Sequence, residues 1–155
     1  MLTPLKKQKT RRSRGSFAII ASRYNARYVD AMAASAEEEL KKAGARKVRV
    51  IRVPGAFEIP AVAARLASAR PRFSALICLG VILRGQTSHA QQIADAVSGA
   101  LAQLQIQHAL PVIHEVLLLK NQAQADVRCL DKKHNRGAEA AQTALEMARI
   151  MASLP

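Results

Sequence analysis

The sequence is poor in aromatic residues: it has no tryptophan, and tyrosine and phenylalanine together make up 3% of its 155 residues. Proteins that bind single-stranded nucleic acids commonly stack the bases on aromatic rings. This scarcity therefore argues against a protein dedicated to reading nucleic acids.

Long hydrophobic runs are absent as well. The stretch 75–81 is apolar throughout, but it is far shorter than the ~20 residues that a membrane-spanning helix needs, and Arg84 follows it closely. The N-terminus lacks the apolar core of a secretory signal peptide. We therefore expect a cytoplasmic protein that has no membrane partner.

Cysteine is rare. Cys78 and Cys129 stand far apart, with neither a Cys-x-x-Cys spacing nor a pattern of neighbouring histidines. This predicts two thiols in a reducing compartment, and neither a disulfide nor a metal site. A chain of this length can bury a stable core without such cross-links, so we expect one domain with a single core.

Acidic residues are outnumbered: 24 Lys and Arg stand against 11 Asp and Glu, and the formal net charge is +13. No acidic residue precedes Asp30. Residues 1–15 are polar and strongly basic, which predicts a disordered tail in front of a domain at 16–155. The positive charge favours anionic ligands, and we expect nucleic acid to bind the tail only non-specifically.

Within the domain, short apolar segments alternate with alanine-rich helical patterns. We predict strands at 17–21, 48–53, 75–81 and 111–118. Three helices are predicted by apolar residues spaced three or four positions apart: Val29, Met32, Ala33, Ala36 and Leu40; Ile93, Val97, Ala100, Leu101 and Leu104; and Ala141, Ala144, Leu145, Ala148 and Met151. This alternation predicts an α/β fold, a three-layer αβα sandwich with a four-stranded parallel sheet of flavodoxin-like topology.

Ligands of such sheets bind beyond the carboxyl ends of the strands. This rule selects four segments that carry polar residues or glycine, at 22–25, 54–58, 84–89 and 114–117. We expect these segments to meet at one edge of the sheet and to form the binding site.

The segment 84–89 has the features of an anion site at the start of a helix. Ser88 and Gln91 have the spacing of a capping box, which predicts a helix start. Gly85 would allow a ligand to approach the backbone closely.

The residues around that glycine could take part in chemistry. The free N–H groups of Gln86 and Thr87 would face an anion at the helix N-terminus. His89 follows in the first helical turn, where an imidazole can accept or pass on a proton. The alternative for His89 is a partly exposed histidine without a role.

Two further segments offer contacts for an organic ligand. Pro54-Gly55 makes a sharp exit from a strand, so Phe57 and Glu58 are displayed at the edge, where a carboxylate accepts hydrogen bonds from hydroxyl groups. Tyr24 ends the first strand, and its ring could stack on a planar ligand. The alternatives are a favourable charge near a helix N-terminus for Glu58 and surface packing for Tyr24.

Basic residues gather before the last helix. Arg128 leads a group of cations ahead of Asn135, which is a credible N-cap for that helix. Arginine can bind a phosphate through two hydrogen bonds at once. A solvated basic stretch is the alternative.

Four motifs together resemble the lumazine synthase family. They are VPGAFEIP at 53–60, GVILRGQTSH at 80–89, NRGAEAA at 135–141 and ALEMA at 144–148. The resemblance covers about residues 16–152, with every element in order and no large insertion. The first two motifs in combination are highly specific.

The resemblance implies a particular reaction. The family condenses 5-amino-6-(D-ribitylamino)uracil with 3,4-dihydroxy-2-butanone 4-phosphate to 6,7-dimethyl-8-ribityllumazine, the penultimate step of riboflavin synthesis, and releases phosphate and water. It uses no metal and no redox cofactor. It works as a homo-oligomer (a pentamer, a pair of pentamers or a sixty-subunit shell) with active sites between subunits, and riboflavin synthase is a candidate partner.

The resemblance also implies roles for individual residues. Those matched to the binding of the pyrimidine and its ribityl chain are Tyr24, Ala56, Phe57, Glu58, Val81, Ile82, Leu83 and His114. Those matched to the butanone phosphate are Gln86, Thr87 and Arg128, the last contributed by a neighbouring subunit. His89 matches the histidine that transfers protons.

The chain departs from the family pattern at three places. His114 stands where the family usually has an apolar residue, often phenylalanine, Gln86 replaces a small residue, and Lys133-His134 replaces a small pair. We expect His114 to weaken pyrimidine binding when it becomes charged near its ordinary pKa of about 6.5. Two alternatives remain: a relative that binds lumazine or flavin but turns over poorly, and a basic scaffold that holds nucleic acid.

Overall fold

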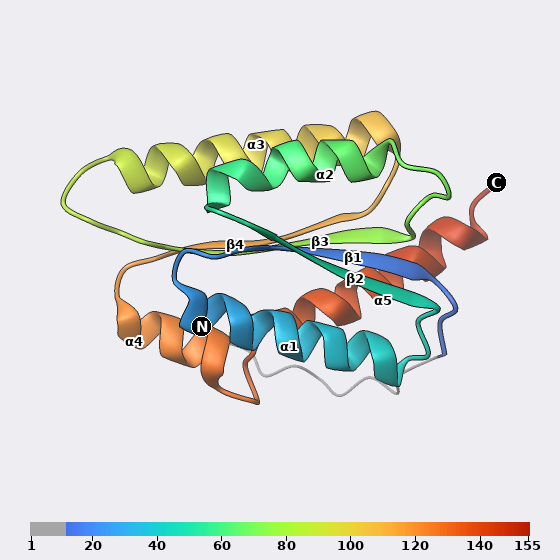
Figure 1. Cartoon of the computed structure of the whole chain (residues 1–155), viewed down its shortest axis with the longest axis horizontal. Coiled ribbons are helices and arrows are strands. Elements are labelled where there is room, and N and C mark those ends of the chain that lie inside the picture. Colours follow the sequence, from blue (N-terminus) through green and yellow to red (C-terminus); the bar gives the residue numbers. More distant parts are fainter. Residues whose placement is uncertain (1–11) are drawn as a thin grey trace.

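The computed structural model describes residues 12–155, so most of the predicted tail at 1–15 lies outside the described residues. The strands are β1 (Ser16–Ser22), β2 (Lys47–Val53), β3 (Ala75–Leu83) and β4 (Val112–Leu119). The helical elements are α1 (Ala26–Lys42), η1 (Ala56–Glu58), α2 (Ile59–Ala67), α3 (His89–His108), α4 (Gln122–Ala125), η2 (Asp126–Leu130) and α5 (Arg136–Ser153). Figure 1 shows how strands and helices alternate along the chain.

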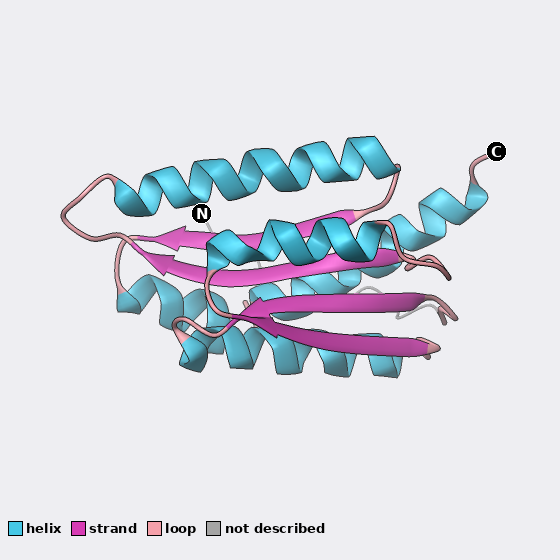
Figure 2. Ribbon diagram, turned by 45° about the horizontal axis from the view of Figure 1, so that its top comes forward, coloured by secondary structure: helices cyan, strands magenta, loops and turns pink. Residues whose placement is uncertain are grey.

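All four strands are parallel, in the order β2-β1-β3-β4. Helices α2 and α3 cover one face of the sheet, and α1, α4 and α5 cover the other (Figures 1 and 2). This arrangement confirms the predicted three-layer sandwich, and the strand order is that of flavodoxin-like sheets. β2 and β4 are the edge strands, and each leaves one side of its backbone open.

The two central strands are buried on both faces, as their continuous apolar sequences predict. Side chains of β1 alternate between the layers: Phe17 and Ile19 pack with α1 and α5, whereas Ala18 and Ile20 pack with α2 and α3. All four are fully buried. Because burying one isoleucine side chain contributes about 1.5–3 kcal/mol, this core holds the strand ends, and the loops on them, firmly in place.

The helical stripes read from the sequence face the sheet. In α1 the buried residues are Tyr28 and the predicted Val29, Met32, Ala33, Ala36 and Leu40. Gly44 follows that helix with a left-handed φ of 83°, as a residue after a helix C-terminus commonly does. Val97 and Leu101 of α3 and Ala141 and Ala144 of α5 are buried, and the other predicted members of these two stripes are partly buried.

Two local expectations are wrong. The side chain of Ser88 makes no cap hydrogen bond, because its backbone is already near-helical (φ −72°, ψ −3°) rather than extended. β4 continues to Leu119, so the segment 114–117 lies inside the strand and not beyond its end. β4 is an edge strand of the sheet, and polar side chains such as His114 and Glu115 are tolerated on such a strand.

Ordered contacts begin before the expected domain boundary at residue 16. The N–H of Ser13 donates to the Ala43 carbonyl at 2.7 Å, and the N–H of Arg46 donates to the Gly15 carbonyl at 2.9 Å. Residues 13–15 are thus bonded to the connection between α1 and β2. Within residues 12–155, every helix is too short or too polar to cross a lipid bilayer.

Candidate active site

The loops that follow β1, β2 and β3 meet at the carboxyl edge of the sheet. The N–H groups of Arg23 and Tyr24 both donate to the Pro54 carbonyl, each at 3.2 Å. The side-chain amide of Asn25 donates to the Val81 carbonyl at the end of β3, at 2.7 Å. These bonds confirm that the loops after β1 and β2 gather beside the end of β3, as predicted.

Asn25 accounts for the sharp turn from β1 into α1. Its backbone is left-handed (φ 55°, ψ 45°), a conformation that asparagine tolerates better than most residues. Its side chain makes no cap bond to α1, because the amide reaches across to β3 instead. The residue therefore fastens the first loop of the site to the third.

Two aromatic rings lie exposed at this edge. Tyr24 is 77% exposed and Phe57 is 61% exposed. The other aromatic residues, Phe17, Tyr28 and Phe73, are buried. Exposed apolar rings beside polar loops are typical of a surface that a ligand or another subunit covers. A planar ring would suit them, because aromatic faces prefer to stack.

Glu58 lies at the end of η1, next to Phe57, and is exposed. Its Oε2 accepts the backbone N–H of Gly55 at 2.8 Å, which orients the carboxylate. Pro60 stands in the first turn of α2, as its missing N–H requires. Because one oxygen is engaged with the backbone, the other is available to accept hydrogen bonds from hydroxyl groups.

The loop between β3 and α3 is held by an arginine that the sequence analysis did not select. The N–H of Arg84 donates to the Leu119 carbonyl at 2.8 Å, and its guanidinium donates to Oε1 of Gln91 at 2.8 Å. Gln91 in turn donates to Asp95 at 2.8 Å. Gln91 was expected to close a capping box, and it anchors this loop instead. An arginine four residues ahead of the helix-start serine was the available signal.

The remaining residues of this loop are open to solvent. Gln86, Thr87 and His89 are exposed, and within residues 12–155 no hydrogen bond engages their side chains. A Cβ on Gly85 would meet nothing within 4 Å. The loop therefore presents its polar groups outward at the N-terminus of α3, a setting that favours an anion.

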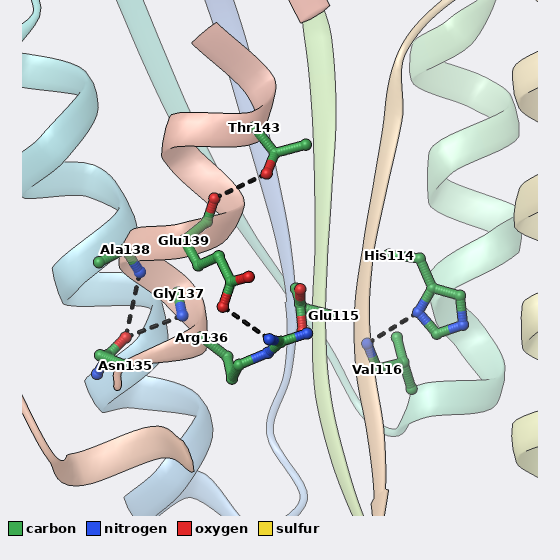
Figure 3. A network of polar contacts seen from close by, with 9 residues as sticks. All are labelled: His114, Glu115, Val116, Asn135, Arg136, Gly137, Ala138, Glu139 and Thr143. Carbon is green, nitrogen blue, oxygen red and sulfur yellow. Dashed lines mark hydrogen bonds and ion pairs between the residues drawn. The ribbon is translucent and has the colours of Figure 1, made fainter. Parts of the chain in front are cut away.

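His114 lies elsewhere. It is in register with Cys78 in the middle of β3, roughly 17 Å before the end of β4 at about 3.3 Å per residue. Its Nδ1 accepts the N–H of Val116 at 3.1 Å (Figure 3), and its Nε2 lies 2.7 Å from Oγ of Ser98 in α3. Burial of part of the ring lowers its pKa. Within one chain His114 is thus remote from the carboxyl edge.

Arg128 follows β4, in an element that contacts α1. It lies in η2, half-buried, and its neighbour Cys129 packs into the core on the side of α1 and α5. Within residues 12–155, no hydrogen bond or ion pair joins Arg128 to the loop at 84–88. The expected phosphate ligands are therefore not in direct contact with one another within one chain.

A half-buried ion-pair network that the sequence analysis missed lies behind β4 (Figure 3). The guanidinium of Arg136, the first residue of α5, donates to Glu115 at 3.1 Å and to Glu139 at 2.7 Å. Glu115 is 7% exposed, and burial raises its pKa to about 7, against the opposing effect of Arg136. The three-residue spacing of Arg136 and Glu139 in a helix was the available signal.

Asn135 is confirmed as the N-cap of α5. Its Oδ1 accepts the N–H groups of Gly137 and Ala138 at 2.8 and 3.2 Å (Figure 3). Its Nδ2 donates to the Cys129 carbonyl at 2.5 Å. Asn135 therefore joins η2 to α5 and holds the backbone from which Arg136 extends.

The two cysteines are buried free thiols, as expected. Burial raises the pKa of Cys78 to about 12 and that of Cys129 to about 11, so neither is a nucleophile near neutral pH. Among residues 12–155, no group of three or more His, Cys, Asp or Glu side chains is placed to hold a metal ion.

Comparison with known proteins gives a consistent result. Residues 14–152 match the family model described as 6,7-dimethyl-8-ribityllumazine synthase. Proteins of that name from Stenotrophomonas maltophilia (strain R551-3) and Xanthomonas oryzae pv. oryzae (strain PXO99A) are each 40% identical over 141 residues. The alignments cover 90% of this chain, and 90% and 91% of the two relatives, respectively.

Proposed function

We propose an arrangement of the active site between two copies of this chain, on the premise that it belongs to the 6,7-dimethyl-8-ribityllumazine synthase family. The chain is a transferase of riboflavin biosynthesis. It condenses 5-amino-6-(D-ribitylamino)uracil with 3,4-dihydroxy-2-butanone 4-phosphate to 6,7-dimethyl-8-ribityllumazine and releases phosphate and water. Enzymes of this family act on small molecules and work as oligomers.

The carboxyl edge of one copy binds the pyrimidine. Tyr24 and Phe57, the two exposed rings, offer aromatic faces to it, and the oriented carboxylate of Glu58 accepts hydrogen bonds from the ribityl hydroxyls. The end of β3 offers backbone groups to the uracil ring. The residues in contact with this substrate are Tyr24, Ala56, Phe57, Glu58, Val81, Ile82 and Leu83.

The loop at the start of α3 binds the butanone phosphate. Gln86 and Thr87 are exposed there, and the N-terminus of a helix favours a phosphate group. Arg84, tied to Gln91, keeps the loop in place. His89 is exposed in the first turn of α3, next to this loop, where it transfers protons during the reaction.

His114 and Arg128 come from the adjacent copy. The observation that carries this proposal is the position of His114, roughly 17 Å back along β4 from its carboxyl end. Arg128 lies in η2, on the side of the sheet covered by α1 and α5, whereas the loop at 84–88 leads into α3 on the opposite side. One chain thus carries two incomplete halves of a site. Both halves are completed when the open edge of β4 and η2 of one copy approach the carboxyl edge of the next.

Such a head-to-tail contact repeats around a ring if the rotation closes. We therefore infer a cyclic assembly: a pentamer, a pair of pentamers or a sixty-subunit shell, with riboflavin synthase as a candidate partner. Light scattering separates these three sizes directly. The two free thiols support a reducing location such as the cytoplasm.

Positioning contributes most of the catalysis. The 5-amino group adds to the butanone carbonyl, and loss of water gives an imine. Phosphate is then eliminated, and the nitrogen that carries the ribityl chain closes the ring with loss of a second water. Holding two reactants together contributes up to about 7–11 kcal/mol. His89 moves protons in these steps, which typically contributes roughly 10²–10⁴-fold.

Mixed oligomers test the shared site. His89→Ala and Arg128→Ala, each nearly inactive alone, are co-expressed with different tags. If the two residues come from different copies, random mixing restores about a quarter of the sites, because an intact half from each variant must meet. The measurement is turnover of purified mixed oligomers, with their composition checked by mass spectrometry.

The matched control combines His89→Ala with Tyr24→Ala, both in the half of the site at the carboxyl edge. Mixing these two variants should restore no wild-type sites, because every site receives one defective half. Absence of recovery with the Arg128 variant, in oligomers shown to be mixed, would place both residues in the site of one chain.

A further inference from the structure

On the α3 side of β4, Ser98 and His114 form a hydrogen-bonded pair. Oγ of Ser98 lies 2.7 Å from Nε2 of His114, and Nδ1 accepts the N–H of Val116 at 3.1 Å. β4 is an edge strand, so backbone groups on its outer side have no neighbouring strand to bond. The imidazole thus satisfies an edge N–H with one nitrogen and meets a hydroxyl with the other.

These two contacts determine where the ring proton lies. A backbone N–H can only donate, so Nδ1 must carry a lone pair, and the proton of the neutral ring is then on Nε2. Nε2–H therefore donates to Oγ of Ser98. This direction excludes Ser98 as a nucleophile activated by His114, because a general base would have to accept the hydroxyl proton at Nε2.

The surroundings favour the uncharged ring. Partial burial lowers the pKa of His114, and the facing thiol of Cys78 on β3 has a pKa raised to about 12. Glu115 points into the other layer, where it pairs with Arg136 of α5. The ionisable residues of α3 are His89, Asp95 and His108. Within residues 12–155, no ion pair joins a carboxylate to the imidazole of His114.

We propose that Ser98 is a positioning residue for the condensation: by accepting the Nε2–H of His114, it fixes the tautomer and the orientation of that ring at the open edge of β4, for contact with the pyrimidine bound by the adjacent copy. This inference rests on the shared site proposed above. Because both ring nitrogens are engaged, the ring offers the pyrimidine its face and no hydrogen bond. The pair therefore selects a planar, uncharged heteroaromatic ring.

A fixed tautomer changes the pH dependence expected from the sequence. A histidine with an ordinary pKa would become charged near pH 6.5 and weaken pyrimidine binding. Protonation of His114 requires Nδ1 to give up its bond from Val116, and burial opposes the charge as well. The Michaelis constant for the pyrimidine should therefore stay nearly constant from about pH 8 down to about pH 6.

The test uses the assembled full-length enzyme labelled with ¹⁵N-histidine. The imidazole nitrogens of His114, identified by their loss in His114→Phe, are followed by NMR between about pH 5.5 and pH 8. We expect an unprotonated Nδ1 and a protonated Nε2 from about pH 8 down to about pH 6. In Ser98→Ala the two tautomers should mix, whereas Ser98→Thr, which keeps the hydroxyl, should restore the wild-type signals.

Kinetics supply the second readout. Ser98→Ala should raise the Michaelis constant for the pyrimidine about 3- to 10-fold, as expected for one lost neutral hydrogen bond, and leave that for the butanone phosphate unchanged. Ser98→Thr should behave as wild type.

The two proposals fail in distinguishable ways. A charged or mixed-tautomer His114 in the wild type, or Ser98→Ala without effect on the tautomer, overturns the role of Ser98 and leaves the shared site intact. If the tautomer is fixed as stated but His114→Ala leaves the Michaelis constant for the pyrimidine unchanged, then His114 is outside the site. That result overturns its placement in the proposed function, and the role of Ser98 in catalysis with it.

Discussion

Single polar side chains in and around this site take their orientation from the backbone. Asn25 donates to the Val81 carbonyl, Glu58 accepts from the N–H of Gly55, and His114 accepts from the N–H of Val116. A backbone partner is already in place before a substrate arrives. Little side-chain entropy is then lost on binding, which is how a preformed site gains affinity.

The first prediction at this scale concerns the proton-transferring histidine. His89→Ala should lower kcat roughly 10²–10⁴-fold, the usual contribution of one acid–base group. Because His89 is exposed and its side chain forms no described hydrogen bond, the oligomer and pyrimidine binding should be preserved. Turnover, light scattering and binding of the pyrimidine measure the three properties. Normal turnover in the variant removes His89 from the mechanism.

The second concerns Glu115, whose pKa burial raises from 4.5 to about 7. Between these two pH values the folded state holds more protons than the unfolded state. The contribution of Glu115 to the free energy of unfolding is therefore greatest below about pH 4.5 and falls as the pH rises towards about 7. At 1.36 kcal/mol per pKa unit, this loss reaches about 3 kcal/mol.

Glu115→Gln cannot ionise and should remove that part of the pH dependence. The measurement is the denaturant midpoint of both proteins at about pH 5 and pH 8, at one fixed protomer concentration. Equal slopes with pH in the two proteins would show that Glu115 titrates normally in the folded state.

Among the elements, the contact of α5 with α1 matters most for where the second half of the site lies. The N-terminus of α5 packs so closely on α1 that a Cβ on Gly137 would overlap the backbone carbonyl of Met32. Gly137 is buried, and its N–H is held by the cap residue Asn135. This packing sets the position of Arg136 and of the turn η2 that carries Arg128.

The prediction at this scale follows from that contact. Gly137→Ala should destabilise the fold by about 1–3 kcal/mol or more, since backbone must move to admit one methyl group. Gly99→Ala is the matched control: it lies in the middle of α3, a Cβ there would meet nothing within 4 Å, and it should stabilise by about 0.5–1 kcal/mol. Chemical denaturation measures the free energy of unfolding of both variants. An unchanged free energy for Gly137→Ala would contradict the close packing.

For the molecule as a whole, charge and open edges govern association. The chain carries a net charge of +13, and each edge strand has one side with no neighbouring strand. A surface of one sign keeps copies apart unless specific contacts bring them together, and it attracts polyanions. In the proposed arrangement the assembly depends on specific contacts at β4 and at the carboxyl edge, and we expect the basic N-terminal residues to bind polyanions non-specifically.

The last prediction separates these two contributions. Deleting residues 1–12 removes Lys6, Lys7, Lys9, Arg11 and Arg12 but keeps Ser13 and its bond to Ala43. Turnover and particle size should be unchanged, and co-purified nucleic acid should fall and depend less steeply on salt. Deletion of residues 1–15 should destabilise the fold more, because it also removes the backbone hydrogen bonds of Ser13 and Gly15. Loss of the oligomer in the shorter deletion would show that the tail takes part in assembly.

Much of the fold can be predicted from the sequence, because the spacing of apolar residues indicates which side chains are buried. The continuous apolar run at 75–81 indicates a strand covered on both faces, and β3 is such a strand. The stripe from Val29 to Leu40 indicates a helix on the sheet, and α1 buries it. The gathering of the first loops also follows, since parallel strands place their carboxyl ends together.

The local expectations that failed depend on conformation and not on residue type. Ser88 and Gln91 have the spacing of a capping box, yet the box requires an extended backbone at the serine, and the chain enters α3 already turned. Gln91 is instead bonded to Arg84. His114 was assigned to a strand end because polar residues commonly follow strands, but β4 lies at the edge of the sheet and tolerates polar residues within it.

The sequence by itself determined the layers, the parallel sheet, the loops at its carboxyl edge and the motifs of the family, because each of these follows from local patterns along the chain. Only the tertiary structure decided that Glu115 pairs with Arg136, that Ser98 meets His114, and that His114 lies in β4 well before its carboxyl end. These are contacts between residues far apart in the sequence. Their geometry depends on strand register and helix packing, which no local pattern encodes.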